Sequence, residues 1–233
     1  LTQGPKIRQF EENFAEKHEV SHALAVTSCT TGLHLALAAM GVGPGDEVIV
    51  PAFTWVATAN VVLYCGATPV FVDVSTKTFN MDPEQVANKV TDKTKAIIPV
   101  HLFGLCADMD AIKAVLPKRV KILEDAACAA GAKYKGRYAG TLGDAASFSF
   151  HPRKSITTGE GGMVTTQENS LYTLMDQMRN HGATISEEQR HLGPKPYILP
   201  DFNLLGFNYR MTDLQGSIGI VQLEKLDSFI DER

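Results

Sequence analysis

Lys154 stands in a segment whose residue types could support amine chemistry. The apolar run 145–150 is expected to form a strand that ends just before this lysine, and the stretch 155–162 after it is rich in small residues. Small residues let a ligand approach the backbone closely. A lysine amine that faces a ligand can form an imine with its carbonyl carbon. A single loop lysine is usually only solvated, so this interpretation depends on its neighbours in the fold.

Asp125 is expected near the same edge of the sheet. The apolar stretch 121–124 is expected to form a buried strand, and it runs into Asp125 and then into an Ala-rich segment. In α/β sheets the carboxyl ends of the strands open onto the ligand crevice. Asp125 is at least as well explained as the N-cap of an Ala-rich helix that follows it, and the two roles are compatible.

A third segment, 27–33, is dense in hydroxyl side chains at a predicted strand-to-helix turn. The backbone N–H groups and the dipole of such a helix start favour a phosphate, although Ser and Thr at this position often only cap the helix. The segment lacks a Walker lysine and a Gly-x-Gly-x-x-Gly pattern, so nucleoside triphosphates and dinucleotides are weaker interpretations.

Trp55, the single tryptophan, lies at another predicted strand-to-helix junction, where core packing is its default role. Together the four features offer an amine, a carboxylate, an anion-binding helix start and an aromatic plate. Pyridoxal phosphate (PLP) needs such a set. Its ring nitrogen must stay protonated, which a facing carboxylate ensures, and its phosphate anchors it while the lysine is exchanged for a substrate amine.

The elements that must position these residues alternate along the chain. Strand-length apolar runs alternate with segments of helical period, which predicts an α/β fold with a mixed, mostly parallel sheet flanked by helices. Strands are expected at 22–27, 47–50, 68–72, 96–100, 121–124, 145–150 and 162–165. Helices are expected at 5–18, 31–40, 55–65, 83–90, 108–116, 168–181 and 212–233. The stretch 182–209 is expected to be a long excursion that faces a ligand or a partner.

Composition excludes several classes of protein. The 233 residues are 44% hydrophobic and 21% charged with a net charge of −4, which is ordinary globular composition without a large nucleic-acid footprint. The four cysteines form no Cys-x-x-Cys pair, which favours a reducing, cytoplasmic compartment. Polar residues and prolines interrupt the uncharged run 48–72, so no membrane span is expected. His18 and His22 do not fit a zinc motif, and no metal site is expected.

Five segments resemble the nucleotide-sugar aminotransferases, often called the DegT/StrS family. They are 27–37, 51–55, 124–127, 148–162 and 208–215, in order along the chain, and the lysine segment FSFHPRK with TGEGG is the most specific. The resemblance implies that 1–233 is the large PLP-binding domain of the aspartate-aminotransferase fold (fold type I), without the extreme N-terminus and the small C-terminal domain. It also implies a PLP-dependent aminotransferase that moves an amino group, with glutamate as the expected donor, to a keto-deoxysugar nucleotide in amino sugar or polysaccharide biosynthesis.

The resemblance further implies a role for each matching residue. Lys154 would bind the cofactor and then act as the acid and base that moves the substrate proton. Asp125 would pair with the pyridine nitrogen, and Trp55 would stack on the ring. The phosphate ligands would be Thr30, Thr31 and Ser149, with Asn208 reaching the phosphate of a neighbouring subunit. The site is therefore expected at the two-fold interface of a homodimer.

Two departures from the family pattern stand near the expected cofactor. Cys128 occupies a position that usually holds Gln or His and contacts the cofactor's phenolic oxygen, and Cys29 replaces a common Gly in the phosphate turn. Lys154 argues against the sugar 3-dehydratase branch, which has His at that position. A PLP enzyme of another reaction type, such as a dehydratase or lyase, stays open as an alternative, and so does a non-catalytic regulatory PLP-binding protein.

Overall fold

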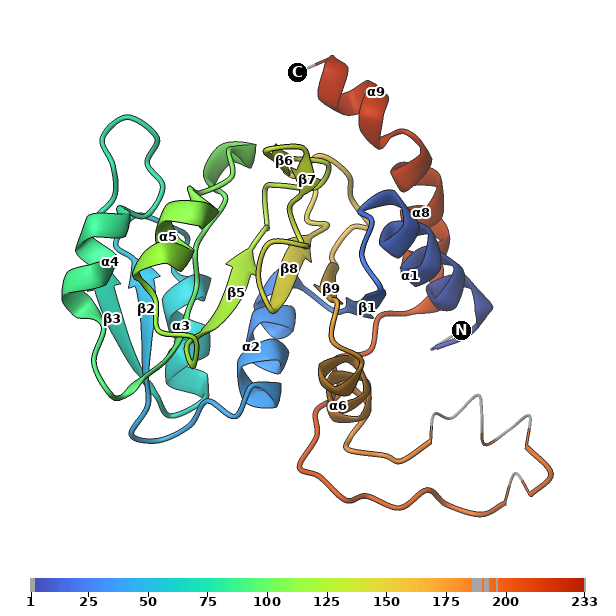
Figure 1. Cartoon of the computed structure of the whole chain (residues 1–233). Helices are drawn as coiled ribbons and strands as arrows, with labels where there is room; N and C mark the ends of the chain where they lie inside the picture. Colours follow the sequence, from blue (N-terminus) through green and yellow to red (C-terminus); the bar gives the residue numbers. More distant parts are fainter. Residues whose placement is uncertain (1–2, 186–189, 191–192, 196, 233) are drawn as a thin grey trace.

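The computed structural model describes residues 3–185, 190, 193–195 and 197–232 (Figure 1). The strands are β1 His22–Val26, β2 Glu47–Pro51, β3 Thr68–Val72, β4 Thr94–Ile97, β5 Lys121–Asp125, β6 Lys133–Tyr134, β7 Arg137–Tyr138, β8 Ala145–Ser149 and β9 Gly162–Thr166. The helices are α1 Pro5–Lys17, α2 Cys29–Ala39, α3 Ala57–Tyr64, α4 Pro83–Lys89, the 3-10 turn Leu102–Gly104, α5 Met109–Val115, α6 Asn169–Arg179, α8 Asp213–Glu224 and α9 Leu226–Asp231.

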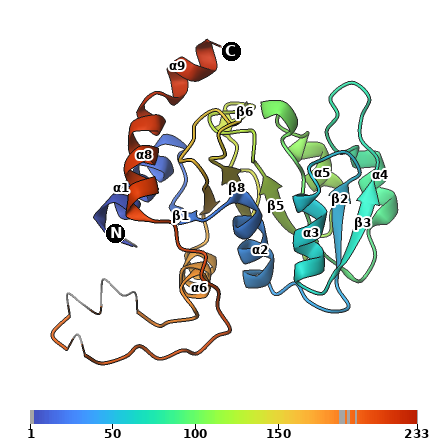
Figure 2. The same cartoon turned by 180° about the vertical axis from the view of Figure 1, so that it is seen from behind.

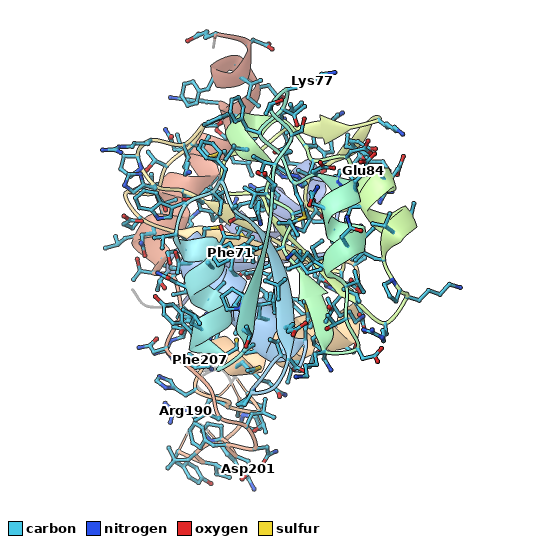
Figure 3. All side chains as sticks on the ribbon, turned by 90° about the vertical axis from the view of Figure 1, so that its left-hand side faces the viewer. Phe71, Lys77, Glu84, Arg190, Asp201 and Phe207 are labelled. Atoms are coloured by element: carbon cyan, nitrogen blue, oxygen red, sulfur yellow. The ribbon has the colours of Figure 1, made fainter. Side chains whose placement is uncertain are left out.

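Seven strands form one mixed sheet in the order β1-β9-β8-β5-β4-β2-β3. The pairs β2/β3, β2/β4, β4/β5 and β5/β8 are parallel, and β9 runs antiparallel to both β8 and β1. The predicted mixed, mostly parallel sheet is therefore confirmed. Because β1, β5 and β8 all point the same way, their carboxyl ends meet at one edge of the sheet, where ligand crevices form in α/β folds. Figure 3 views the molecule from the left-hand side of Figure 1, where Phe71 lies on the edge strand β3.

Helices cover both faces of this sheet, as Figures 1 and 2 show from opposite sides. Alternation along β1 separates the two cores: Leu24 and Val26 join the cluster under α2, α3 and α6, whereas Ala23 and Ala25 join the cluster under α1 and α8. A third cluster lies under α4 and α5. The central strands are apolar on both sides because both of their faces are buried.

Helix α1 packs on α8 through two glycines. A Cβ on Gly219 would stand 2.7 Å from the Phe10 ring, and one on Gly216 would stand 3.0 Å from the backbone nitrogen of Ile7. Phe10 and Phe14 are fully buried, and the Phe14 and Phe148 ring centroids are 5.0 Å apart. Burying each such ring contributes about 1.5–3 kcal/mol. The close packing of α1 on α8 therefore holds α8 against the rest of the fold.

Three local predictions differ from the structure. The Ala-rich stretch after Asp125 is a series of turns and not a helix, and Asp125 bonds the Ala127 N–H in the manner of an Asx turn. The expected helix 212–233 is two helices that meet at Lys225, and its residue 233 lies outside the described part. The hairpin β6/β7 was missed, although Lys135 and Gly136, both at positive φ, supply the two-residue turn.

The described parts of the segment between α6 and α8 extend away from the sheet, as Figure 1 shows. Figure 3 places Arg190 and Asp201 at the end of the molecule opposite to Lys77. Apolar side chains on this segment are exposed: Tyr197, Leu199, Phe202 and Leu205. This geometry agrees with the long excursion that the sequence predicts for residues 182–209.

Candidate active site

The carboxyl ends of β1, β5 and β8 and the segment after β2 surround a cavity of about 630 Å³. Five residues predicted from the sequence line it: Thr30, Trp55, Asp125, Ser149 and Lys154. The rest of the lining is Thr27, Ser28, Cys29, Leu33, Ala57, Ala127, His151, Arg153 and Glu160. The fold therefore brings an amine, a carboxylate, a hydroxyl-rich helix start and an aromatic side chain to one space.

Asp125 ends β5 and is 5% exposed. The Thr58 hydroxyl donates to its Oδ2 atom at 2.8 Å, and the Ala127 N–H donates to Oδ1 at 3.2 Å. Burial raises the pKa of the Asp125 carboxyl above its ordinary 3.8, while the Thr58 hydrogen bond and the Lys154 charge oppose this rise. The carboxylate is thus held in a fixed orientation, and it would gain stability from a cationic ring facing it.

Thr58 is a site residue that sequence reasoning missed. It lies in the first turn of α3, is fully buried, and its hydroxyl is also 3.0 Å from the Thr54 hydroxyl. Nothing in its local sequence separates it from an ordinary helix threonine. Its role follows only from the packing of α3 against the end of β5.

Lys154 follows β8 in a turn in which its backbone N–H donates to the His151 carbonyl at 2.9 Å. Its amine donates to the Cys128 sulfur at 3.1 Å. Cys128 belongs to the turns that replace the expected helix after Asp125. The residue that departs from the family pattern therefore touches the lysine itself.

Cys29, the second departure, lies beneath the carboxylate. Its thiol donates to the Ser147 carbonyl at 3.4 Å and lies 4.0 Å from Asp125 Oδ1. Burial raises the pKa of the Cys29 thiol well above 9.0, and the Asp125 charge adds to that rise. The residue thus acts as a buried neutral thiol under the site.

The start of α2 provides the hydroxyl-rich end of the cavity. Ser28 caps the helix by accepting from the Thr31 N–H at 3.1 Å, and the Thr31 hydroxyl accepts from the Ser28 N–H at 3.0 Å. This capping box engages the Thr31 side chain, which is not among the lining residues, whereas Ser28 and Thr30 do line the cavity. The arrangement leaves Ser28, Thr30 and the positive end of the helix dipole for an anion.

Trp55 and Asn208 differ in where they lie. Trp55 is 78% exposed on the cavity wall, so the default of core packing is wrong for it. Asn208 is exposed on the segment before α8, where its backbone bridges to Asn180, and it does not line this cavity. Its predicted contact with a neighbouring subunit stays a prediction.

Three further polar residues stand beside Lys154. His151, Arg153 and Glu160 line the cavity, and His151 Nε2 lies 3.9 Å from Glu160 Oε1. The sequence left open whether His151 lines the site or packs beneath it. The structure shows that it lines the site.

A buried pair next to Asp125 stiffens this end of β5. The Glu124 carboxylate accepts from His101 Nε2 at 2.8 Å and from three backbone N–H groups, those of Gly140, Leu142 and Gly143. The Ala107 N–H donates to His101 Nδ1, which leaves the ring proton on Nε2. The backbone N–H of His101 donates to the backbone carbonyl of Asp125 at 3.0 Å. These bonds position the Asp125 backbone and were not predicted from the sequence.

A larger cavity of about 760 Å³ lies between α1 and α6, but its buried charges are paired with each other. The Arg179 guanidinium donates to Glu11 and Asp176 at 2.5 and 2.9 Å. Within the described residues no group of three or more His, Cys, Asp or Glu side chains could hold a metal ion. No helix in the described part of the chain is long and apolar enough to cross a bilayer.

Known proteins resemble this chain along its whole length. GDP-perosamine synthase from Caulobacter vibrioides is 48% identical over 231 residues, which cover 99% of this chain and 59% of that protein. The structure of an aminotransferase from Psychrobacter cryohalolentis matches with a TM-score of 0.91 at 41% identity and covers 97% of this chain and 57% of that one.

A protein described as a sugar aminotransferase from Streptococcus pneumoniae, solved in a PLP form, matches with a TM-score of 0.88 at 34% identity over 98% of this chain and 61% of that one. The chain thus spans about three fifths of the length of these proteins. The sequence profile of the DegT/DnrJ/EryC1/StrS aminotransferase family matches residues 1–233. The chain belongs to this family.

Proposed function

We propose that the protein is a PLP-dependent aminotransferase that moves an amino group from glutamate to a keto carbon of a nucleotide-linked deoxysugar. One observation carries the proposal. Lys154 and the buried carboxylate of Asp125 lie far apart in the sequence, yet both line a single cavity together with Trp55 and the start of α2.

The residues of the cavity fit PLP. Asp125 is buried with its Oδ2 and Oδ1 atoms oriented by Thr58 and Ala127, and burial raises its pKa above the ordinary value. A protonated pyridine nitrogen would be a cationic partner for this carboxylate. Ser28 and Thr30 face the cavity at a helix start, where a phosphate is favoured. Trp55 offers an exposed ring to a flat heterocycle.

Each residue then has a distinct task. When bound, PLP supplies an electron sink that lets a proton leave the carbon next to the substrate nitrogen. Lys154 takes up and returns that proton at its amine, which lies on the cavity wall. Asp125 keeps the proton on the ring nitrogen, and Trp55 limits the movement of the ring.

The substrate class rests on the relatives. The Caulobacter relative is named GDP-perosamine synthase, and a Bacillus subtilis relative at 43% identity is named a spore coat polysaccharide biosynthesis protein. A keto-sugar nucleotide as acceptor, in the synthesis of an amino sugar for a polysaccharide, agrees with both names. Arg153 beside Lys154 is placed to attract an anionic substrate.

We further infer that the enzyme works as a homodimer in the cytoplasm. The exposed apolar side chains Tyr197, Leu199 and Leu205 lie on the segment that leads to Asn208, which suits a segment that covers a neighbouring subunit. In such a dimer Asn208 would reach the phosphate of the partner's cofactor. All four cysteines are free, which agrees with a reducing compartment.

Trapping and product analysis test the proposal together. Borohydride should fix PLP irreversibly on Lys154, as the mass of the peptide that carries residue 154 would show, and Lys154→Ala should abolish this labelling. With 15N-glutamate and a keto-deoxysugar nucleotide, the product should contain the labelled nitrogen. Labelling of a different lysine would overturn the Lys154 assignment.

Two rivals predict other outcomes of the same experiments. A dehydratase or lyase on this scaffold would bind PLP on Lys154 but transfer no nitrogen from glutamate. A regulatory protein would bind PLP tightly and show no half-reaction with any amino donor. Either result would remove the aminotransferase proposal.

A further inference from the structure

The Cys128 thiol and the Lys154 amine form a contacting pair of nucleophiles, of which Lys154 lines the cavity. Their heavy atoms are 3.1 Å apart, which is direct contact between nitrogen and sulfur. We propose that peroxide converts this pair into a covalent sulfur–nitrogen cross-link, which blocks the cofactor lysine reversibly. The consequence for catalysis rests on the proposed function, whereas formation of the cross-link does not.

Cys128 differs from the other three cysteines in its surroundings. Burial raises the pKa of Cys29 well above 9.0, and it raises the pKa values of Cys65 and Cys106 to about 11. Thiols in such surroundings stay protonated and react slowly with oxidants. Cys128 is half-buried beside an amine, and its neighbours Ala127 and Lys154 line the open cavity, through which a small oxidant can enter. Reactive cysteines are found in such partly exposed, cationic settings.

The chemistry needs hydrogen peroxide as its only co-reactant. The Cys128 sulfur attacks one peroxide oxygen, the O–O bond breaks, and water leaves with the thiol proton, so that a sulfenic acid forms. Once the Lys154 ammonium group has given a proton to water, its amine attacks this sulfur, the S–O bond breaks, and hydroxide leaves as water with a proton from the amine. Sulfur loses two electrons and one peroxide is reduced, so the chain loses two hydrogen atoms overall. A dithiol returns the two electrons and restores both side chains.

Peptide mass spectrometry tests the proposal directly. The purified protein, stripped of cofactor, is treated with hydrogen peroxide and digested under non-reducing conditions. We expect a joined pair of peptides that carry residues 128 and 154, lighter by two hydrogens than their sum, which dithiothreitol separates. Loading the protein with PLP before the treatment should suppress the joined pair because Lys154 is then occupied.

Cofactor uptake provides a second measurement. After peroxide treatment the wild-type protein should take up PLP poorly until dithiothreitol is added. Cys128→Ala and Cys128→Ser, each compared with its own untreated sample, should lose PLP uptake more slowly than the wild type. The matched control Cys65→Ala should behave like the wild type, because burial raises the pKa of the Cys65 thiol to about 11 and the thiol that contacts Lys154 is that of Cys128.

The outcomes separate this proposal from the proposed function. A residue-128 peptide that carries only sulfinic or sulfonic acid, with Lys154 unmodified, would overturn the cross-link. Equal loss of PLP uptake in wild type and Cys128→Ala would overturn its role as a switch. A protein that forms the cross-link but never binds PLP would contradict the proposed function and leave the cross-link established.

Discussion

Thr58→Val should weaken PLP binding because it removes one support of Asp125. The Thr58 hydroxyl donates to Asp125 Oδ2 at 2.8 Å, and the side chain is fully buried, so water does not readily replace the lost donor. Valine retains the shape of threonine. A hydrogen bond to a charged group contributes about 1.5–3 kcal/mol. If the ionised carboxylate must hold the ring nitrogen protonated, this loss corresponds to about 10- to 140-fold weaker binding of PLP.

The single tryptophan makes the measurement direct. Trp55 lines the cavity and is 78% exposed, so its fluorescence should be quenched as PLP enters. Titration gives the dissociation constant for wild type, Thr58→Val and Thr58→Ser. The serine variant keeps the donor and should bind within about threefold of wild type. Thr54→Val, a matched control, removes the hydroxyl that contacts Thr58 at 3.0 Å but keeps the bond to Asp125, and it should have an intermediate effect.

One result would refute this reasoning. If Thr58→Val and Thr58→Ser bind PLP with equal affinity, and both unfold at the wild-type urea midpoint, the hydroxyl has no role in holding Asp125. A valine variant with a lowered midpoint but unchanged affinity would assign Thr58 to packing alone.

Three further predictions concern buried charges. Because the pKa of Asp125 is raised, its contribution to stability is present below the ordinary 3.8 and is lost as pH rises through the raised value. At pH 7, Asp125→Asn should therefore be more stable to urea than the wild-type apoprotein. It should also bind PLP more weakly. Lower stability at pH 7 would contradict this prediction. Burial lowers the pKa of His18 from 6.5 to about 4, so the unfolded chain takes up the proton first as pH falls. Between pH 6.5 and about pH 4 the urea midpoint of the wild type should therefore drop more steeply than that of His18→Gln. Parallel curves of urea midpoint against pH would contradict this prediction. Arg179→Met should destabilise the fold by about 3–5 kcal/mol because it leaves Glu11 unpaired in the interior, and Glu11→Gln added to it should restore part of the loss in urea unfolding. No restoration would argue against an unpaired charge as the cause.

Hydrophobic pattern was sufficient to find the seven strands of the sheet, although β4 lies at Thr94–Ile97 and only partly overlaps the predicted range 96–100. Prediction was weaker where tertiary contacts override the local pattern. An Ala-rich stretch favours a helix by propensity, yet Asp125 bonds the Ala127 N–H and the chain turns. On α8 the apolar side chains of Leu214, Ile218 and Val221 are exposed, whereas Gly216 and Gly219 are buried against α1. Glycine carries almost no hydrophobic signal, so a face formed by close helix packing is invisible in such a pattern.

The candidate site also combines features that the sequence predicted with features that it did not. The family resemblance implied roles for Lys154, Asp125, Thr30, Trp55 and Ser149, and the fold brings these five residues to one cavity. Parallel strands place their carboxyl ends at one edge, so residues that follow such strands meet whatever their distance in the sequence. The exposure of Trp55 could not be deduced, because a tryptophan next to a helix is ordinarily buried.

The sequence by itself determined the fold class and selected Lys154 and Asp125 as candidates, because periodicity and motif chemistry are local properties that a chain carries before it folds. Only the tertiary structure decided that Thr58 orients Asp125, that His101 and Glu124 anchor the end of β5, and that Cys128 touches Lys154. These contacts join segments that no local pattern connects. Their energies depend on burial and on distances of a few ångströms, which exist only once the sheet and its helices have packed.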